Sequence, residues 1–423
     1  MLFTFAAWWT VSSSSHGDNV SRYLRLASVR TLFTNARLIL SPEAGIKMRS
    51  LLVEDGIISA IPTQEEGLGA PFDEEIDCGG DFLGPGLVDI HCHGAIGRDT
   101  MEASDGAFRA ILSHHALSGT TTAVLTTVAA TLGEMLAVLR CAGNHRSSEG
   151  TARLTGVHLE GPYFSPLRRG AHRADRLRLP SDEETQQLLD NAALIRRMTL
   201  APELPGALDA VRRLVQKGIM ASAGHSDASR DEALAGFHAG IRQVTHLHNA
   251  MSSVHKTGDH REGLAEAALV TEGILCEVIA DGVHVSPSQL REAWLAKGWD
   301  GMALVSDATA GAGLEDGAAF DLGGLSCRIE GKAAWTGEGE FQRLAGSTAP
   351  LFEGVRTMVE SVGVALEEAI AMASITPARS LGIEYESGSL EAGKNADLIR
   401  FDEGWNLKGV WIGGRRLGMG DMG

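Results

Sequence analysis

The sequence contains few cysteines, and their pattern argues against a disulfide framework. Five cysteines are scattered over 423 residues and form no CxxC pair. An odd number of widely spaced thiols is typical of a protein in a reducing compartment, so we expect no disulfides and a cytoplasmic location. The cysteines are Cys78, Cys92, Cys141, Cys276 and Cys327.

Long apolar runs and an excess of positive charge are also missing. No stretch approaches the roughly 18 apolar residues that a membrane-spanning helix requires. The formal charge of −17 argues against nucleic acid or an anionic membrane as a partner. The apolar start MLFTFAAWW has no basic residues before it. We therefore expect residues 1–30 to be a disordered extension, with a secretion signal as the alternative.

Short β-rich stretches broken by Gly or Asp occur at both ends of the chain. They include TLFTNARLIL and LLVEDGIISAI near the start, and ADLIRFD and LKGVWIGG near the end. Such segments are typical of strands joined by tight turns. We expect residues 31–83 and 385–423 to pair into one small β-sandwich domain, which leaves residues 84–384 as the main domain.

The main segment alternates strand-like apolar runs with helical patterns. One helix start is marked by Ser181, which is followed three residues later by Glu184. Eight strands alternating with helices over about 220 residues predict an α/β fold, a (β/α)8 TIM-like barrel. A doubly wound open sheet is the alternative, but no GxGxxG follows the first strand. Hairpin-like pieces follow the eighth run. The runs are GLVDIHCH, TTTAVLTT, LTGVHLEGP, RMTLAPE, GIMASAGHS, IRQVTHLHNA, ILCEVIADG and MALVSDA.

Ionisable side chains stand where these eight strands end, and this end of a TIM barrel carries the chemistry. His91 and His93 are two residues apart, so they share one face of the first strand. A packed barrel interior prefers branched apolar residues, so this many ionisable groups predict a metal site. The residues at the strand ends are His91, His93, Glu160, Glu203, His225, His246, His248, Asp281, His284 and Asp307.

The ligand types indicate the class of reaction. Imidazole and carboxylate groups suit Zn²⁺, Fe²⁺, Co²⁺ or Mn²⁺, and the set contains no thiolate that would indicate a softer site. A metal with an open position lowers the pKa of bound water to about 7. Asp307 could take the proton of that water and return it to a leaving group, so the pattern predicts metal-assisted hydrolysis.

Longer motifs occur in order over nearly the whole fold. They are PGLVDIHCHG, VHLEGPYFSPLRRGAH, TLAPE, AGHS, THLHNAM, IADGVHV, LVSDATAGAG, LAGS and GSLEAGKNADL. With these motifs the chain resembles the amidohydrolase superfamily and, within it, the N-acetylglucosamine-6-phosphate deacetylases. HLEGP with GAH, and HxxNAM with IADGxHV, are much more specific than HxH alone.

The resemblance implies which residues at the strand ends bind metal and which take part in catalysis. Asp307 would be the general base and acid, and His172 would polarise the acetyl carbonyl oxygen. Family members without the histidine pair use one metal, so the number of divalent ions per subunit is open at one or two. The implied ligands are Glu160, His225 and His246 for the principal metal, and His91 and His93 for a second one.

The resemblance also implies a pocket for a sugar phosphate. Arg261 would bind the phosphate, but the loop after Met251 is longer than in the family and lacks its proline, so Lys256 and Arg168 are alternatives. The family suggests an arginine supplied across a dimer, which predicts a homodimer. The residues implied in substrate binding are Ala171, His172, Asn249, Ala250, Arg261, Asp281, His284, Leu344, Ala345 and Gly346.

The expected function is the removal of acetate from N-acetylglucosamine 6-phosphate, which leaves glucosamine 6-phosphate. One alternative is another substrate, such as N-acetylgalactosamine 6-phosphate. A second is a non-catalytic protein with the amidohydrolase fold, although such a scaffold should have lost the ligands that this sequence keeps. Cyclic-amide and dipeptide hydrolases often use a carbamylated lysine at the end of the fourth strand, and TLAPE offers none.

Overall fold

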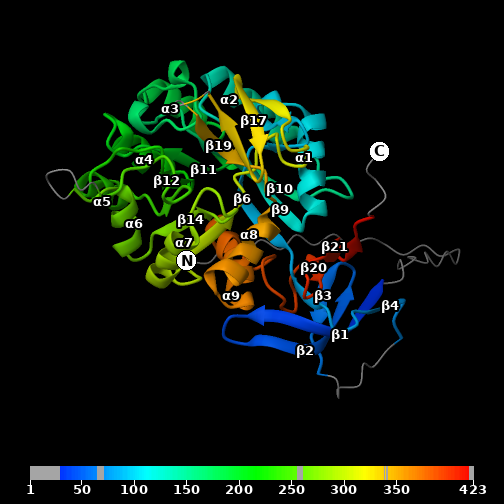
Figure 1. The fold of residues 1–423 in the computed structure, drawn as a ribbon. Coiled ribbons are helices and arrows are strands. Elements are labelled where there is room, and N and C mark those ends of the chain that lie inside the picture. Colours follow the sequence, from blue (N-terminus) through cyan, green and yellow to red (C-terminus); the bar gives the residue numbers. More distant parts are fainter. Residues whose placement is uncertain (1–28, 64–70, 255–260, 338, 340–341, 419–423) are drawn as a thin grey trace, which may run out of the picture.

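The computed structural model of the chain describes residues 29–63, 71–254, 261–337, 339 and 342–418. Residues 1–28, on which most of the predicted extension falls, lie outside these ranges. The described residues form a barrel that is surrounded by helices. A second sheet lies apart from the barrel (Figure 1). All five cysteines are free thiols. None of the helices in these ranges has the length and apolar character that crossing a membrane requires.

Eight parallel strands form the barrel, as predicted, and each pairs with its neighbour in chain order. The ring is completed just beyond the last strand. There the backbone N–H of Asp307 donates to the carbonyl of His91 at 3.0 Å, and that of His93 donates to Ala308 at 2.7 Å. The ring therefore closes at the C-terminal ends of the strands. These are β6 (Leu87–Cys92), β9 (Thr120–Thr126), β10 (Arg153–Glu160), β11 (Ile195–Leu200), β12 (Met220–Ala223), β13 (Gln243–Val244), β14 (Leu275–Ile279) and β15 (Met302–Val305).

Helices cover the outside of the barrel, and several begin at the capping residues that the sequence supplies. The Ser181 side chain accepts a hydrogen bond from the backbone N–H of Glu184, as predicted. Thr131, Ser229 and Ser286 each form a capping box with the residue three positions later. The helices are α1 (Asp105–Leu117), α2 (Leu132–Asn144), α3 (Asp182–Leu189), α4 (Ala207–Gln216), α5 (Arg230–Ala239), α6 (Leu264–Val270), α7 (Pro287–Lys297), α8 (Leu351–Thr357), α9 (Leu366–Met372) and α10 (Ile375–Leu381).

A four-stranded antiparallel sheet stands beside the C-terminal mouth of the barrel, where hairpins were predicted. Its last strand is tied to the end of β15, because the N–H of Ser347 donates to the carbonyl of Asp307 at 2.9 Å. This bond brings residues 344–346 next to the strand ends. The strands are β16 (Ala319–Leu322), β17 (Leu325–Glu330), β18 (Ala333–Thr336) and β19 (Arg343–Ser347), and a short hairpin of β7 (Gly94–Ala95) and β8 (Arg98–Asp99) follows β6.

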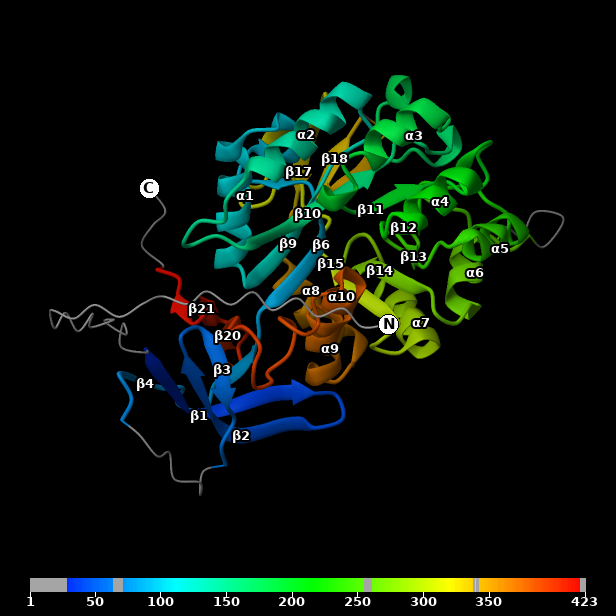
Figure 2. The same cartoon turned by 180° about the vertical axis from the view of Figure 1, so that it is seen from behind.

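Strands from the two ends of the chain form the separate sheet, which confirms the predicted small β domain. The blue strands of the N-terminal segment and the red strands of the C-terminal segment lie together in Figures 1 and 2, and they join where Phe82–Pro85 pairs with Leu398–Phe401. The sheet has its own apolar core, in which the rings of Phe33 and Trp411 pack edge to face with centroids 5.1 Å apart. Its strands are β1 (Arg30–Ser41), β2 (Gly45–Glu54), β3 (Ile57–Ala60), β4 (Glu74–Asp77), β5 (Phe82–Pro85), β20 (Leu398–Phe401), β21 (Leu407–Ile412) and β22 (Arg415–Arg416).

The interior of the barrel is polar, in contrast to the branched apolar interior usual for this fold. The Oγ1 atom of Thr245 lies 2.8 Å from that of Thr199 and 2.6 Å from Oγ of Ser222. Beside these hydroxyls Arg197 and Glu277 form an ion pair in which both side chains are fully buried. Buried polar groups cost free energy unless they are hydrogen-bonded. The interior therefore contains two sets of hydrogen-bonded polar groups, one of hydroxyls and one around Glu277.

Candidate active site

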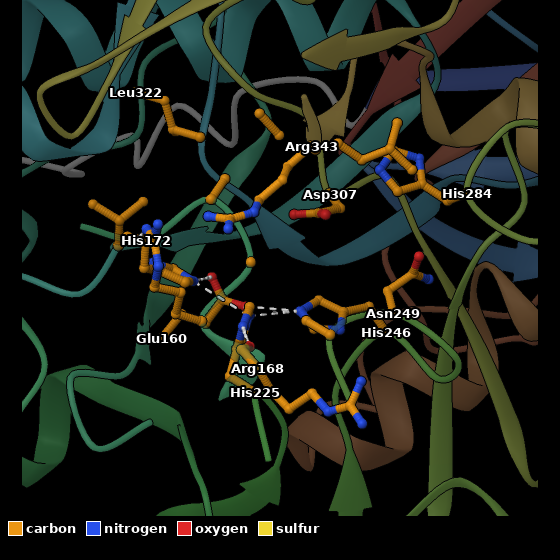
Figure 3. Close-up of a pocket in the computed structure, with 18 of the residues that line it drawn as sticks. Glu160, Arg168, His172, His225, His246, Asn249, His284, Asp307, Leu322 and Arg343 are labelled. Atoms are coloured by element: carbon orange, nitrogen blue, oxygen red, sulfur yellow. Dashed lines mark hydrogen bonds and ion pairs between the residues drawn. The ribbon is translucent and has the colours of Figure 1, made fainter. Parts of the chain in front are cut away.

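A cavity of about 430 Å³ lies at the C-terminal ends of the barrel strands (Figure 3). Most of the site residues predicted from the sequence line this single cavity. His91 lies beneath it, fully buried, with its Nε2 3.2 Å from that of His93. The predicted residues that line the cavity are His93, Glu160, Ala171, His172, His225, His246, His248, Asn249, Ala250, His284, Asp307, Leu344, Ala345 and Gly346.

Five of these residues other than glycine have a left-handed backbone, which is unusual for side chains larger than glycine. The φ angles are 48° at His225, 33° at His246, 47° at Asp307, 74° at His248 and 46° at Ala250. His225, His246 and Asp307 each stand two positions after the last residue of a barrel strand. Such conformations cost about 1–3 kcal/mol each and cluster at functional sites. The strained turns therefore belong to the part of the barrel that carries the cavity.

Glu160, His225 and His246 form a compact group of metal-ligand atoms. The Nε2 atoms of His225 and His246 are 3.0 Å apart, and each lies 3.1 Å from Oε1 of Glu160. Nδ1 of His225 is 3.0 Å from the carbonyl oxygen of Arg168 and must donate to it. In the neutral ring the Nε2 atom of His225 is therefore unprotonated and available to a metal.

His91 and His93 form a second group on the other side of Glu160. Nε2 of His93 lies 3.3 Å from Oε2 of Glu160 and 3.2 Å from Oδ1 of Asp307. Nε2 of His91 lies 3.6 Å from Oε1 of Glu160, the oxygen that also faces His225 and His246, so the carboxylate of Glu160 contacts both groups of histidines. The geometry fits two adjacent cation sites that share this carboxylate.

The two carboxylates at the centre of the site are held in their charged form. Burial raises the pKa of Glu160, but the nearby rings of His91 and His172 lower it more, so the pKa lies well below its usual range. Burial also raises the pKa of Asp307, while His91 and a hydrogen bond from His93 bring it below its ordinary value. Two buried negative charges therefore face the cavity, and they favour a cation between the histidines.

His172 differs from the candidate metal ligands because its neutral ring can donate a hydrogen bond into the cavity. The backbone N–H of Ala129 donates to Nδ1 of His172 at 3.1 Å, so this nitrogen is an acceptor. The proton of the neutral ring then sits on Nε2, which lies 3.4 Å from Oε2 of Glu160. This tautomer fits a hydrogen-bond donor for a substrate oxygen better than it fits a metal ligand.

The predicted phosphate-binding residues are divided between the cavity and the surface. His284 lines the cavity, and its Nδ1 lies 2.7 Å from Oδ2 of Asp281, which stands behind it. Arg261 is exposed and is absent from the residues that line the cavity in the described part of the chain. Of the two alternatives, Lys256 lies outside the described residues, and Arg168 lines the cavity while pairing with Asp227 at 2.7 Å.

Two further arginines, Arg169 and Arg343, line the cavity, and of these Arg343 was not predicted from the sequence. Nη1 of Arg169 donates to the carbonyl of His172 at 2.7 Å. Arg343 extends into the cavity (Figure 3) and forms no ion pair with any described residue. Its position two residues before Ala345 on β19 was the available signal, because alternate residues of a strand share a face.

Other histidines and acids at the strand ends have structural contacts. His158 is buried between Thr199, 2.7 Å from its Nε2, and Thr126, 3.4 Å from its Nδ1. Glu203 accepts hydrogen bonds from the Ser226 hydroxyl and the Asp227 backbone, both at 2.7 Å. These contacts place His158 and Glu203 in supporting positions beside the ligand groups.

Comparison with known proteins gives consistent results. Residues 82–417 match the amidohydrolase family. The chain is 36% identical to N-acetylglucosamine-6-phosphate deacetylase of Vibrio furnissii, over 86% of this chain and 88% of that protein. It is 34% identical to N-acetylgalactosamine-6-phosphate deacetylase of Escherichia coli O157:H7, over 90% and 97%. The crystal structure of N-acetylglucosamine-6-phosphate deacetylase from Pasteurella multocida superposes with a TM-score of 0.84 at 30% identity, covering 92% of this chain and 99% of that one.

Proposed function

The chain belongs to the amidohydrolase family, and we propose that it hydrolyses the acetamide of N-acetylglucosamine 6-phosphate to glucosamine 6-phosphate and acetate. One observation carries this proposal. A single cavity brings together the ligand group of Glu160, His225 and His246, the charged carboxylate of Asp307 and the proton-donating nitrogen of His172. This set contains what amide hydrolysis needs. The free thiols fit the cytoplasmic location that we expect.

The donor set fits one or two divalent cations. Glu160, His225 and His246 would hold the first ion, and His91 and His93 the second, with Glu160 facing both. Nitrogen and oxygen donors of this kind suit Zn²⁺, Fe²⁺, Co²⁺ or Mn²⁺. When bound, the metal would supply Lewis-acid activation of water and of the amide carbonyl near neutral pH.

Two side chains of the cavity account for the proton transfer and the carbonyl contact. Asp307 is ionised, so it can accept a proton from the attacking water and later deliver it to the amine nitrogen as the C–N bond breaks. His172 offers its Nε2 proton to the acetyl oxygen, on which negative charge develops in the transition state. The site thus contains a base that becomes an acid, and a separate donor for the oxyanion.

The phosphate group must meet specific donors, because the protein carries a charge of −17. Burial lowers the pKa of His284, but the hydrogen-bonded carboxylate of Asp281 raises it more, so the ring favours its charged form, in which Nε2 can donate to a phosphate oxygen. Arg343 adds a guanidinium, which can bind phosphate oxygens in a bidentate way. Arg261 lies outside the cavity of its own chain. We therefore assign it to the cavity of a second subunit in a homodimer.

The Arg261→Ala variant should lose kcat/KM for the 6-phosphate, by roughly 10–100-fold if one charge-assisted contact of about 1.5–3 kcal/mol is removed. The unphosphorylated sugar should be almost unaffected, because it lacks the group that Arg261 binds. Steady-state acetate release with both substrates measures this difference. Arg212→Ala, which removes an exposed arginine of α4, is the matched control. Equal losses on both substrates would argue against a phosphate contact.

Mixed dimers show whether Arg261 acts across subunits. A dimer of one Arg261→Ala chain and one Asp307→Asn chain contains a single intact Asp307. If Arg261 acts across subunits, the site with this Asp307 receives an intact arginine, and activity on the 6-phosphate returns to about half of wild type. If Arg261 acts within its own chain, no site has both groups, and the mixed dimer stays as slow as the parents.

A substrate panel tests the assignment of the sugar. Acetate release is measured with N-acetylglucosamine and N-acetylgalactosamine, each with and without a 6-phosphate. We expect the highest kcat/KM with N-acetylglucosamine 6-phosphate. A higher value for the galactosamine compound would favour the alternative substrate, which the Escherichia coli relative makes a definite second candidate. No release from any of the four would favour a non-catalytic protein.

A further inference from the structure

An ion pair lies inside the barrel, where an apolar core would ordinarily be found. Arg197 on β11 and Glu277 on β14 are both 0% exposed, and Nη1 of Arg197 contacts Oε1 of Glu277. A buried ion pair often adds little stability compared with apolar residues of similar volume, because both charges must leave water. Stabilisation of the fold is therefore a weak explanation for the presence of this ion pair. The contacts of Glu277 suggest a different role.

Four groups surround the carboxylate of Glu277. On one side, Nη1 of Arg197 and Nε2 of Gln243 donate to Oε1, the latter at 2.6 Å. On the other side, Oε2 lies 3.1 Å from Nδ1 of His91 and 3.4 Å from the backbone N–H of His246. Only a carboxylate, with two accepting oxygens and no proton, satisfies donors on both sides. Nδ1 of His91 must therefore be the donor in its contact with Glu277.

This contact determines which nitrogen of His91 is free. With the proton of the neutral ring on Nδ1, the lone pair of Nε2 points to the candidate metal site. There it lies 3.2 Å from Nε2 of His93 and 3.3 Å from Oδ1 of Asp307. A carboxylate that holds the other ring nitrogen of a ligating histidine fixes both the tautomer and the ring orientation.

We propose that Glu277 is a positioning residue that fixes His91 as an Nε2 metal ligand, and that Arg197 and Gln243 hold Glu277 in place. The inference rests on the proposed second cation site at His91 and His93. Glu277 touches neither substrate nor metal in this arrangement. It acts only through His91, with a weaker contact to the backbone of His246.

The Glu277→Gln variant tests the inference, because the amide keeps the size but replaces one accepting oxygen with NH₂. If the NH₂ group faces His91, Nδ1 of His91 must become an acceptor, and the ring changes to its other tautomer. If the NH₂ group faces the other way, it meets the donors of Arg197 and Gln243. We expect zinc affinity at the second site to fall about 10–100-fold, as is typical when such a supporting contact is lost. The measurement is zinc content per subunit after dialysis against a series of buffered zinc concentrations.

Two further variants separate positioning from general damage. Ser222→Ala removes a hydroxyl that is equally buried and bonds to Thr245 at 2.6 Å, away from His91. It should lower the melting temperature of the metal-free protein yet keep wild-type zinc binding. If Glu277→Gln does not fold, Gln243→Met replaces it. This variant removes one donor to Oε1 and should weaken zinc binding to a smaller extent.

A double-mutant cycle with His91→Ala decides the outcome. In the His91→Ala background, Glu277→Gln should cause no further loss of zinc, because the residue it positions is gone. Equal losses in both backgrounds would show that Glu277 acts on the fold, and unchanged zinc binding in Glu277→Gln alone would also overturn the inference. A His91→Ala protein that keeps all its zinc would instead show that the proposed second cation site is wrong.

Discussion

Replacing Glu160 with alanine should remove bound metal and reduce acetate release to background. Glu160 faces both histidine groups, with Oε1 3.1 Å from Nε2 of His225 and Oε2 3.3 Å from Nε2 of His93. Its loss leaves either ion short of a ligand and removes the carboxylate that His225 and His246 share. Elemental analysis of the purified variant, together with its turnover, measures the effect.

The matched control for this prediction is Glu203→Ala. Glu203 also follows a barrel strand, but its carboxylate accepts bonds from Ser226 and Asp227 and does not contact the histidines. The control should keep its metal even if it loses some stability. Full metal occupancy in Glu160→Ala would contradict the proposed ligand set.

The Asp307→Asn variant should lose turnover by about 10²–10⁴-fold while it keeps metal and substrate binding. Asparagine preserves the size of the side chain and can still accept a hydrogen bond from His93, but it cannot take up a proton. The loss should therefore appear in kcat with little change in KM. Near-normal turnover, with the metal content of wild type, would show that another group is the base.

The barrel could be predicted from the sequence because each strand leaves a local signal. Short apolar runs such as TTTAVLTT recur between helical patterns, and caps such as Ser181 mark where a helix begins. The closure of the barrel between β6 and β15 has no comparable signal in the sequence. It depends on backbone bonds from Asp307 to His91 and from His93 to Ala308, which join residues more than two hundred positions apart.

The cavity residues were predictable where a motif ends a strand, as at Glu160, His225 and Asp307. Arg343 was missed because it lies in an inserted sheet whose position depends on one strand, β19, bonding to the end of β15. The role inferred for Glu277 was hidden for a related reason. In the sequence it is one charged residue in an apolar run, and only the curvature of the barrel places it against His91 from another strand.

The most direct test of the proposed function is acetate and amine release from N-acetylglucosamine 6-phosphate by the purified protein. The assay is run on protein as purified, after complete chelation, and after the addition of zinc, iron, cobalt or manganese. We predict that acetate and glucosamine 6-phosphate form in equal amounts, that chelation stops the reaction, and that at least one of these metals restores it. Full activity in metal-free protein, or no product with any of the metals, would contradict metal-dependent deacetylation.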